Sequence, residues 1–284
     1  MSEYQYYEFQ AIDKALTPSE QKQIAKISSR VQLTSRTAVF TYNYKDLPVK
    51  PESLLTKYYD AFFYLSNWGK RLMFKLPLEL VDPESLEDYV LDNHLEIKVM
   101  GSFIVLDIDY YKEEAWEDWV EDEGWLSLLL GLRAEILDGD YRSLYIAWLI
   151  LSEIADIDLD TVTPPVPNGL SELTLAQDTL IELFKLDKSL ILASVKLNPE
   201  KAEFDNISDK ELLSLINQIP KEEQQQILLK LLKGEANLSI KLNKCIKEFH
   251  TSKPKDCHRS VSLKQLREMT SSFDRIKSNV NQYS

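Results

Sequence analysis

Glycine and histidine are scarce in this chain of 284 residues, and each scarcity excludes a class of chemistry. No two of the seven glycines lie closer than seven positions. A phosphate-binding loop and a dinucleotide fingerprint both need closely spaced glycines, because only glycine lets backbone amides approach phosphate. Both motifs are therefore excluded. The three histidines belong to no zinc-protease motif, and no nucleophile elbow is present, which argues against hydrolases of those classes.

Cysteine and long apolar runs are equally scarce. Cys245 and Cys257 are the only cysteines, which excludes a disulfide scaffold. No stretch approaches the roughly 18 uninterrupted apolar residues of a membrane span, and residues 1–10 lack the pattern of a signal peptide. We therefore expect a cytoplasmic protein with no membrane attachment. Its length favours about two domains.

Positive charge is missing from the middle of the chain. Residues 1–75 carry a net charge of +4 (11 basic against 7 acidic residues), residues 76–200 carry −21 (7 against 28), and residues 201–284 carry +4 (15 against 11), which sum to the overall −13. Duplex DNA needs Lys and Arg for its phosphates, so the centre is not expected to bind it. A field of this sign attracts basic partners.

The N-terminal third alternates strand and helix patterns. Apolar alternation predicts strands over residues 7–11, 31–33, 38–44 and 72–76. The capping box Thr17-Pro18-Ser19-Glu20 predicts one helix, and a second is expected from Pro51 to Asn67. A helix over 82–92 and a hairpin of 95–99 with 103–108 follow. We expect residues 1–112 to form a ferredoxin-like βαββαβ sheet with added strands.

The remaining patterns are helical, so the expected fold class is α+β. Residues 113–163 hold an acidic tryptophan segment and an αα-hairpin over 125–137 and 141–154. The proline-rich residues 163–169 predict a boundary. Residues 170–250 predict an all-α helical bundle of five short helices. Residues 251–284 predict a basic tail that is helical from 263.

Three short segments resemble those of a group of uncharacterised bacterial proteins. They are Tyr7-Glu8-Phe9-Gln10-Ala11-Ile12-Asp13, Ile27-Ser28-Ser29-Arg30 and Asn67-Trp68-Gly69. The resemblance covers most of the chain apart from residues 250–284. It implies a shared fold and a bacterial origin, and it brings neither an activity nor catalytic residues.

The acidic tryptophan segment is the most distinctive feature of the sequence. Two aromatic anchors lie among carboxylates, which is a pattern suited to docking a basic protein or the basic tail of this chain. The candidate partner-binding residues are Trp116, Trp119, Glu117, Asp118 and Glu121. The alternative is a solvated loop whose tryptophans fold back onto the αα-hairpin.

A second hypothesis places single-stranded RNA on the N-terminal sheet. Aromatic residues on one strand face would stack on bases, and neighbouring cations would neutralise phosphate. The candidates are Arg36, Phe40, Tyr42, Arg71 and Lys75. The RNA-recognition signature is not matched, and alternating aromatics on a sheet are more often part of the core.

Metal chemistry has two weak candidates. Cys245, His250, Cys257 and His258 fall within 14 residues, but their spacing is poor for zinc, and a buried Cys beside a polar tail is the alternative. Asp82 followed by Glu96-x-Lys98 is faintly similar to the carboxylate–carboxylate–lysine set of metal-dependent nucleases. The alternative interpretation is the ordinary charged outer face of an edge strand. We expect no cofactor. The favoured function is a non-enzymatic adaptor that binds a basic protein, ahead of RNA binding and a metal-dependent hydrolase.

Overall fold

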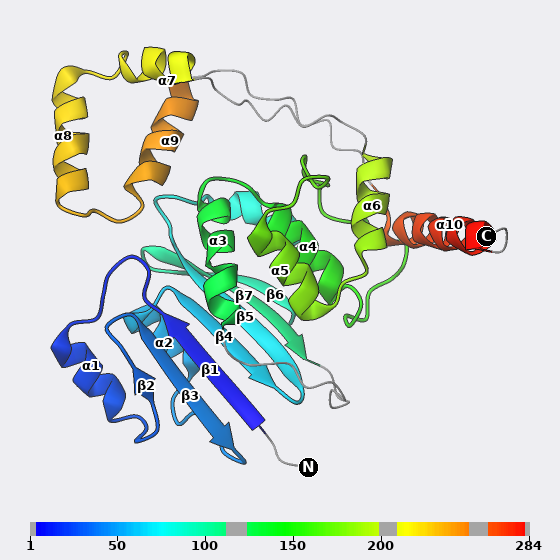
Figure 1. The fold of residues 1–284 in the computed structure, drawn as a ribbon, viewed down its shortest axis with the longest axis horizontal. Coiled ribbons are helices and arrows are strands. Elements are labelled where there is room, and N and C mark those ends of the chain that lie inside the picture. The colour runs from blue at the N-terminus through cyan, green and yellow to red at the C-terminus, as the bar shows by residue number, and fades with distance from the viewer. Residues whose placement is uncertain (1–3, 112–123, 199–208, 250–260, 282–284) are drawn as a thin grey trace.

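The computed structural model describes residues 4–111, 124–198, 209–249 and 261–281. In these ranges seven strands form one sheet in the order β2-β3-β1-β4-β5-β7-β6 (Figure 1). All neighbouring strands run antiparallel. The strands are β1 (Tyr4–Gln10), β2 (Gln32–Leu33), β3 (Thr37–Asn43), β4 (Ala61–Ser66), β5 (Gly69–Pro77), β6 (Leu95–Met100) and β7 (Phe103–Tyr111).

Helices interrupt and follow this sheet, in agreement with the α+β class. The first are α1 (Pro18–Ala25), α2 (Pro51–Tyr58) and the 3-10 helix η1 (Pro83–Tyr89). After the sheet come α3 (Trp125–Leu137), α4 (Arg142–Leu151), α5 (Leu175–Phe184) and α6 (Lys188–Leu197). The last are α7 (Asp209–Ile216), α8 (Lys221–Leu232), α9 (Leu238–Phe249) and α10 (Leu263–Asn281).

The ferredoxin-like topology is not confirmed. β1 pairs antiparallel with both β3 and β4, whereas a βαβ unit places parallel strands side by side. The predicted helix from Pro51 to Asn67 is wrong, because the helix ends at Tyr58 and Ala61–Ser66 forms strand β4. Five of the six β4 residues are buried, which is typical of a central strand covered on both faces. Such a strand is a continuous apolar run that a helical stripe also fits.

Several local predictions are confirmed. The Thr17 hydroxyl accepts from the Glu20 N–H, and the Glu20 carboxylate accepts from the Thr17 N–H, as in a capping box. β6 and β7 form the expected hairpin, which turns at Gly101 with φ of +64°. Ser262 and Gln265 cap the start of α10 reciprocally. The helix expected over 82–92 is the 3-10 helix η1.

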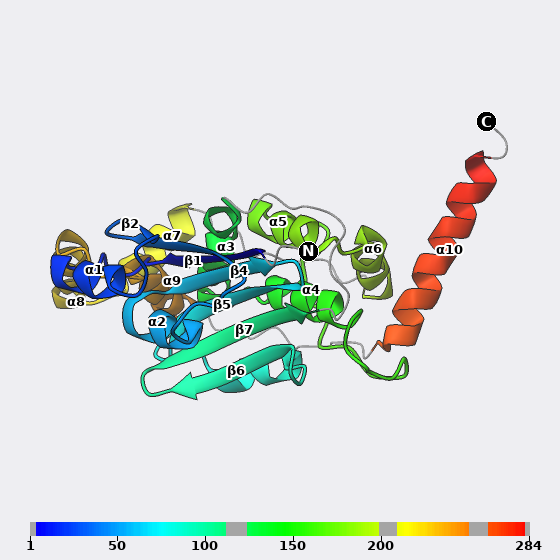
Figure 2. The same cartoon turned by 90° about the horizontal axis from the view of Figure 1, so that it is seen from below.

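Two hydrophobic clusters cover the two faces of the sheet. One includes Phe9, Phe62 and Met73 and packs against α1 and α2. The larger one includes Phe63 and Leu72 and lies under α3, α4 and α5, with residues of α6 joining it beyond the edge of the sheet (Figures 1 and 2). The larger cluster contains residues from each of the four segments expected as separate units, so a shared core crosses the expected boundaries.

The five helices expected over residues 170–250 do not gather in one place. α5 packs against α3 and α4, and α6 packs against α10. α7, α8 and α9 contact one another and bury a separate small set of side chains, Leu215, Ile219, Leu238 and Ile246. The expected bundle is therefore not confirmed. Across the described ranges, no helix has the length and apolar content required to cross a bilayer.

Candidate interaction surface

Two arginines of the acidic central region are engaged in internal pairs. The Arg133 guanidinium, 2% exposed, donates to both oxygens of Asp13 at 3.0 and 2.8 Å. Arg142 donates to Asp140 in the same way and also to the carbonyl oxygens of Gly169 and Glu172. These cations hold the fold together, so they do not neutralise the carboxylates that face solvent.

One set of exposed carboxylates lies around η1, and we name it the acidic platform. It comprises residues 82–92, which contain five acidic residues and no Lys or Arg. All five side chains are exposed: Asp82, Glu84, Glu87, Asp88 and Asp92. Asp82 caps η1 by accepting from the Glu84 N–H at 3.1 Å. No ion pair within the described residues reaches the other four.

The acidic platform is held rigidly from below. Leu86 and Tyr89 point into the larger cluster and are buried. The Ser85 hydroxyl lies 2.9 Å from the Tyr141 hydroxyl, and the Tyr89 and Tyr141 rings pack edge to face at 6.1 Å. Burial, followed by the nearby Asp88, raises the pKa of Tyr89 above its ordinary value. The carboxylates therefore have a fixed support, which lowers the entropy lost on binding a partner.

The predicted partner-binding residues lie outside the described residues. Trp116, Trp119, Glu117, Asp118 and Glu121 fall within residues 112–123. The flanking elements are described: β7 ends at Tyr111, which is 57% exposed, and α3 starts at Trp125. The docking role of residues 113–123 stays a prediction from the sequence.

The predicted RNA-binding residues are mostly engaged within the fold. Phe40 is 1% exposed and belongs to the smaller cluster, and the Tyr42 ring packs edge to face on Tyr7. The Arg36 guanidinium donates to the backbone carbonyls of Ala11 and Ile12 at 3.1 and 2.9 Å. Stacking of a base on Phe40 would require the smaller cluster to open.

Arg71 belongs to an ion network on the face of the sheet that carries α2. Its guanidinium binds Asp107 at 2.8 and 2.6 Å and Glu52 at 2.6 Å. Burial acts to raise the pKa of Glu52, but a backbone N–H and Arg71 outweigh burial, so the pKa of Glu52 lies below its ordinary value. The charge of Arg71 is compensated by these two carboxylates.

The fifth RNA candidate, Lys75, lines a cavity of about 310 Å³ at the end of β1. Its ammonium lies 2.9 Å from Asp60, whose other oxygen accepts from the N–H groups of Ile12 and Asp13. Asp13 also accepts from Asn237, which connects this end of the sheet to the α7–α9 region. Asp60 and Asp13 in the cavity wall pair with Lys75 and Arg133, so this part of the wall belongs to an ion network that stabilises the fold.

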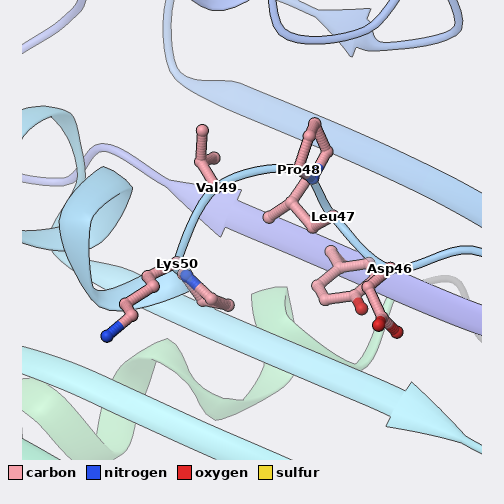
Figure 3. A pocket seen from close by; sticks show the side chains of 7 residues that line it. Asp46, Leu47, Pro48, Val49 and Lys50 are labelled. Carbon is pink, nitrogen blue, oxygen red and sulfur yellow. The ribbon is translucent and has the colours of Figure 1, made fainter.

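A second, open pocket of about 330 Å³ lies under the loop between β3 and α2. Figure 3 shows Asp46, Leu47, Pro48, Val49 and Lys50 along this loop, which passes over β1. Asp46 accepts from Gln5 at 2.9 Å, and Leu47 is buried. The lining is mainly Leu, Pro and Val, which offers packing contacts and no acid–base pair.

Only some of the residues considered for metal chemistry are described by the structure. Cys245 is a free, partly buried thiol on α9, while His250, Cys257 and His258 lie outside the described residues. Asp82 caps η1, and Glu96 pairs with Lys98 on β6. Within the described part of the chain, no group of three or more His, Cys, Asp or Glu side chains is arranged to hold a metal ion.

Sequence reasoning located the central negative charge but missed the acidic platform. The signal was present, because five acidic residues and no basic residue occur within eleven positions.

The comparison of this chain with protein-family models, curated proteins and solved structures finds no match.

Proposed function

We propose that this protein is a non-enzymatic interaction module that binds a basic protein through the acidic platform together with residues 113–123. The observation that carries the proposal is the acidic platform, whose Glu84, Glu87, Asp88 and Asp92 are exposed and have no ion-pair partner among the described residues. Unpaired carboxylates on a rigid support attract and orient a positively charged surface.

Two further features support this proposal. Arg133 and Arg142 of the central region are used internally, so they do not neutralise the carboxylates of the acidic platform. Residues 113–123 add seven acidic residues and two tryptophans in sequence, and large aromatic side chains are frequent anchors of protein interfaces. We include this segment in the proposed binding region on the basis of its sequence.

The test starts with the full chain as bait in an extract of its source cells at about 50 mM and about 500 mM salt. The affinity for a captured protein is then measured for the purified pair. We expect Glu84→Gln/Glu87→Gln/Asp88→Asn to weaken binding by about tenfold, because three attractive charges are lost from the contact. Replacing residues 113–123 with a Ser/Gly segment of equal length should weaken it as well.

A matched variant controls for the change in net charge. Glu182→Gln/Glu223→Gln/Glu268→Gln removes three exposed carboxylates from α5, α8 and α10 and should leave the affinity unchanged. The proposal is rejected if salt does not affect capture, or if the platform triple variant and the control triple variant weaken binding equally.

A further inference from the structure

α8 is an amphipathic helix that has no buried residue. Its leucines are instead exposed: Leu228 (59%), Leu229 (43%), Leu231 (63%) and Leu232 (85%). Figure 1 shows α8 at one end of the long axis, with α10 at the other end. Single exposed apolar residues are ordinary on protein surfaces, whereas a contiguous patch of them marks an interaction site.

One side of α8 is directed toward α7 of the same chain. The Gln224 side chain donates to the carbonyl oxygens of Ile216 and Ile219 at 3.0 and 2.8 Å, which directs it toward α7. Residues spaced by four, three and four positions form one stripe along the helix: Lys221, Gln225, Leu228 and Leu232. This stripe, with Leu229 beside it, is the leucine face of α8.

Charges border the leucine face in a self-complementary pattern. Glu222, Leu229 and Lys233 are spaced by seven and four residues, so they lie along the same border of the face. Glu222 is at the start of α8 and Lys233 at its end. Both side chains are exposed, and neither has an ion-pair partner among the described residues.

From this pattern we infer that α8 binds α8 of a second copy of this chain, antiparallel about a two-fold axis. Residues on the same border of two antiparallel helices meet across such an axis, so Glu222 of each copy faces Lys233 of the other. The leucines of the two copies pack between these ion pairs. A parallel two-fold arrangement would bring opposite borders of the two faces together, so Glu222 and Lys233 would not meet, and the antiparallel surface serves both copies equally, as a two-fold interface requires.

The leucine face does not fit the basic partner proposed for the acidic platform. α8 and its cap carry Lys221, Lys230 and Lys233 against Glu222 and Glu223, so this helix has no negative field. Two helices of twelve residues are each about 18 Å long. The contact is therefore smaller than a standard interface, and we expect self-association that depends on concentration.

Sedimentation velocity of the full chain, from about 1 μM to about 500 μM, tests the inference. The wild type should change from monomer to dimer across this range. Leu228→Glu/Leu232→Glu should weaken the dimer at least about 100-fold, because it places four carboxylates in an apolar contact. Both positions are exposed, so the variant should still fold, which its circular dichroism verifies.

The matched control is Leu192→Glu, an equally exposed leucine (58%) on α6, which should leave the dimer unchanged. A charge exchange tests the antiparallel orientation. Glu222→Lys should weaken the dimer several-fold by facing a lysine with Lys233 of the other copy, and Glu222→Lys/Lys233→Glu should restore it.

Three results would overturn the inference. The first is a wild-type chain that stays monomeric at all concentrations, which would assign the leucine face to a different protein or to another segment of this chain. The second is a dimer that survives Leu228→Glu/Leu232→Glu. The third is a dimer that the charge exchange does not restore. None of these results affects the proposal for the acidic platform, which is measured with a different partner.

Discussion

Carboxylates serve opposite purposes in two regions of this molecule. At the end of β1 and on β7, Asp13, Asp60 and Asp107 each bind a cation that the fold brings to them. On the acidic platform, Glu84 and Glu87 face solvent without such a partner among the described residues. The first group stabilises the fold, whereas the second leaves an electrostatic field for a partner. Net charge per segment does not distinguish the two groups, because pairing depends on the tertiary structure.

The largest effect should come from Arg133, a buried cation with three hydrogen bonds. Arg133→Ala removes both hydrogen bonds to Asp13 and the bond from Nε to the Lys75 carbonyl at 2.9 Å. It leaves the Asp13 carboxylate with Asn237 alone. We expect the free energy of unfolding in urea to fall by about 3 kcal/mol.

A comparison of Arg133 variants sharpens this prediction. Arg133→Lys should lose less stability than Arg133→Ala, because it keeps the charge while losing the two-pronged geometry. A loss below about 1 kcal/mol for Arg133→Ala would show that the Arg133–Asp13 pair contributes no more than an ordinary exposed ion pair. The contrast between the paired carboxylates and the acidic platform would then fail.

Asp60→Asn should have the next largest effect, about 2 kcal/mol. The variant amide can still accept from the N–H of Ile12, but it no longer attracts the Lys75 ammonium, which lies 2.9 Å away in the wild type. Urea unfolding measures the loss. Asp60→Asn/Lys75→Met should recover part of it, because the unpaired ammonium is removed as well. No recovery would indicate that Asp60 acts only through the backbone.

Glu52→Gln tests the ion pair between Glu52 and Arg71, which is partly exposed to solvent. The side chain of Glu52 is 35% exposed, so solvent screens its contact with Arg71, and we expect a loss of only about 0.5 kcal/mol at pH 7. The pKa of Glu52 is lowered in the folded state. Its contribution is therefore present above the unfolded pKa of roughly 4.3 and disappears as pH falls through the folded value.

Urea titrations of the wild type and Glu52→Gln at several pH values check this dependence. The difference between the two proteins should shrink only below about pH 4. A difference that is constant down to about pH 2 would mean that the charge of Glu52 contributes nothing and that the variant acts through packing alone.

The smallest effect on stability is expected for the acidic platform itself. Glu84→Gln/Glu87→Gln/Asp88→Asn should change the free energy of unfolding by less than about 0.5 kcal/mol, because no ion pair among the described residues is broken. The same variant is the one expected to weaken binding of the basic partner. A clear loss of stability in urea would place these carboxylates with the structural group.

Much of the local structure followed from sequence patterns. The caps at Thr17 and Ser262, the β6–β7 hairpin and the helices α3 and α4 are specified by residues close in sequence, so patterns of three to twelve residues reveal them. Strand β4 was missed because it is buried on both faces and lacks the alternation of a half-buried strand.

The candidate site was predicted in part. The sequence showed where negative charge is concentrated, and it identified residues 113–123 as a docking candidate. It did not separate Asp13, which Arg133 holds across 120 positions, from Glu84, which has no such partner among the described residues. It also did not show that the leucines of α8 face outward, since the same residues would suit the centre of a bundle.

The sequence by itself determined the α+β class, the helix caps, the absence of glycine-based phosphate sites and the segregation of charge. These properties depend on composition and on neighbours within a few residues. Only the tertiary structure decided the antiparallel strand order, the pairing of Asp13 with the distant Arg133, and the exposure of the acidic platform and of α8. They depend on which distant segments meet, and that is set by how the two apolar faces of the sheet are covered.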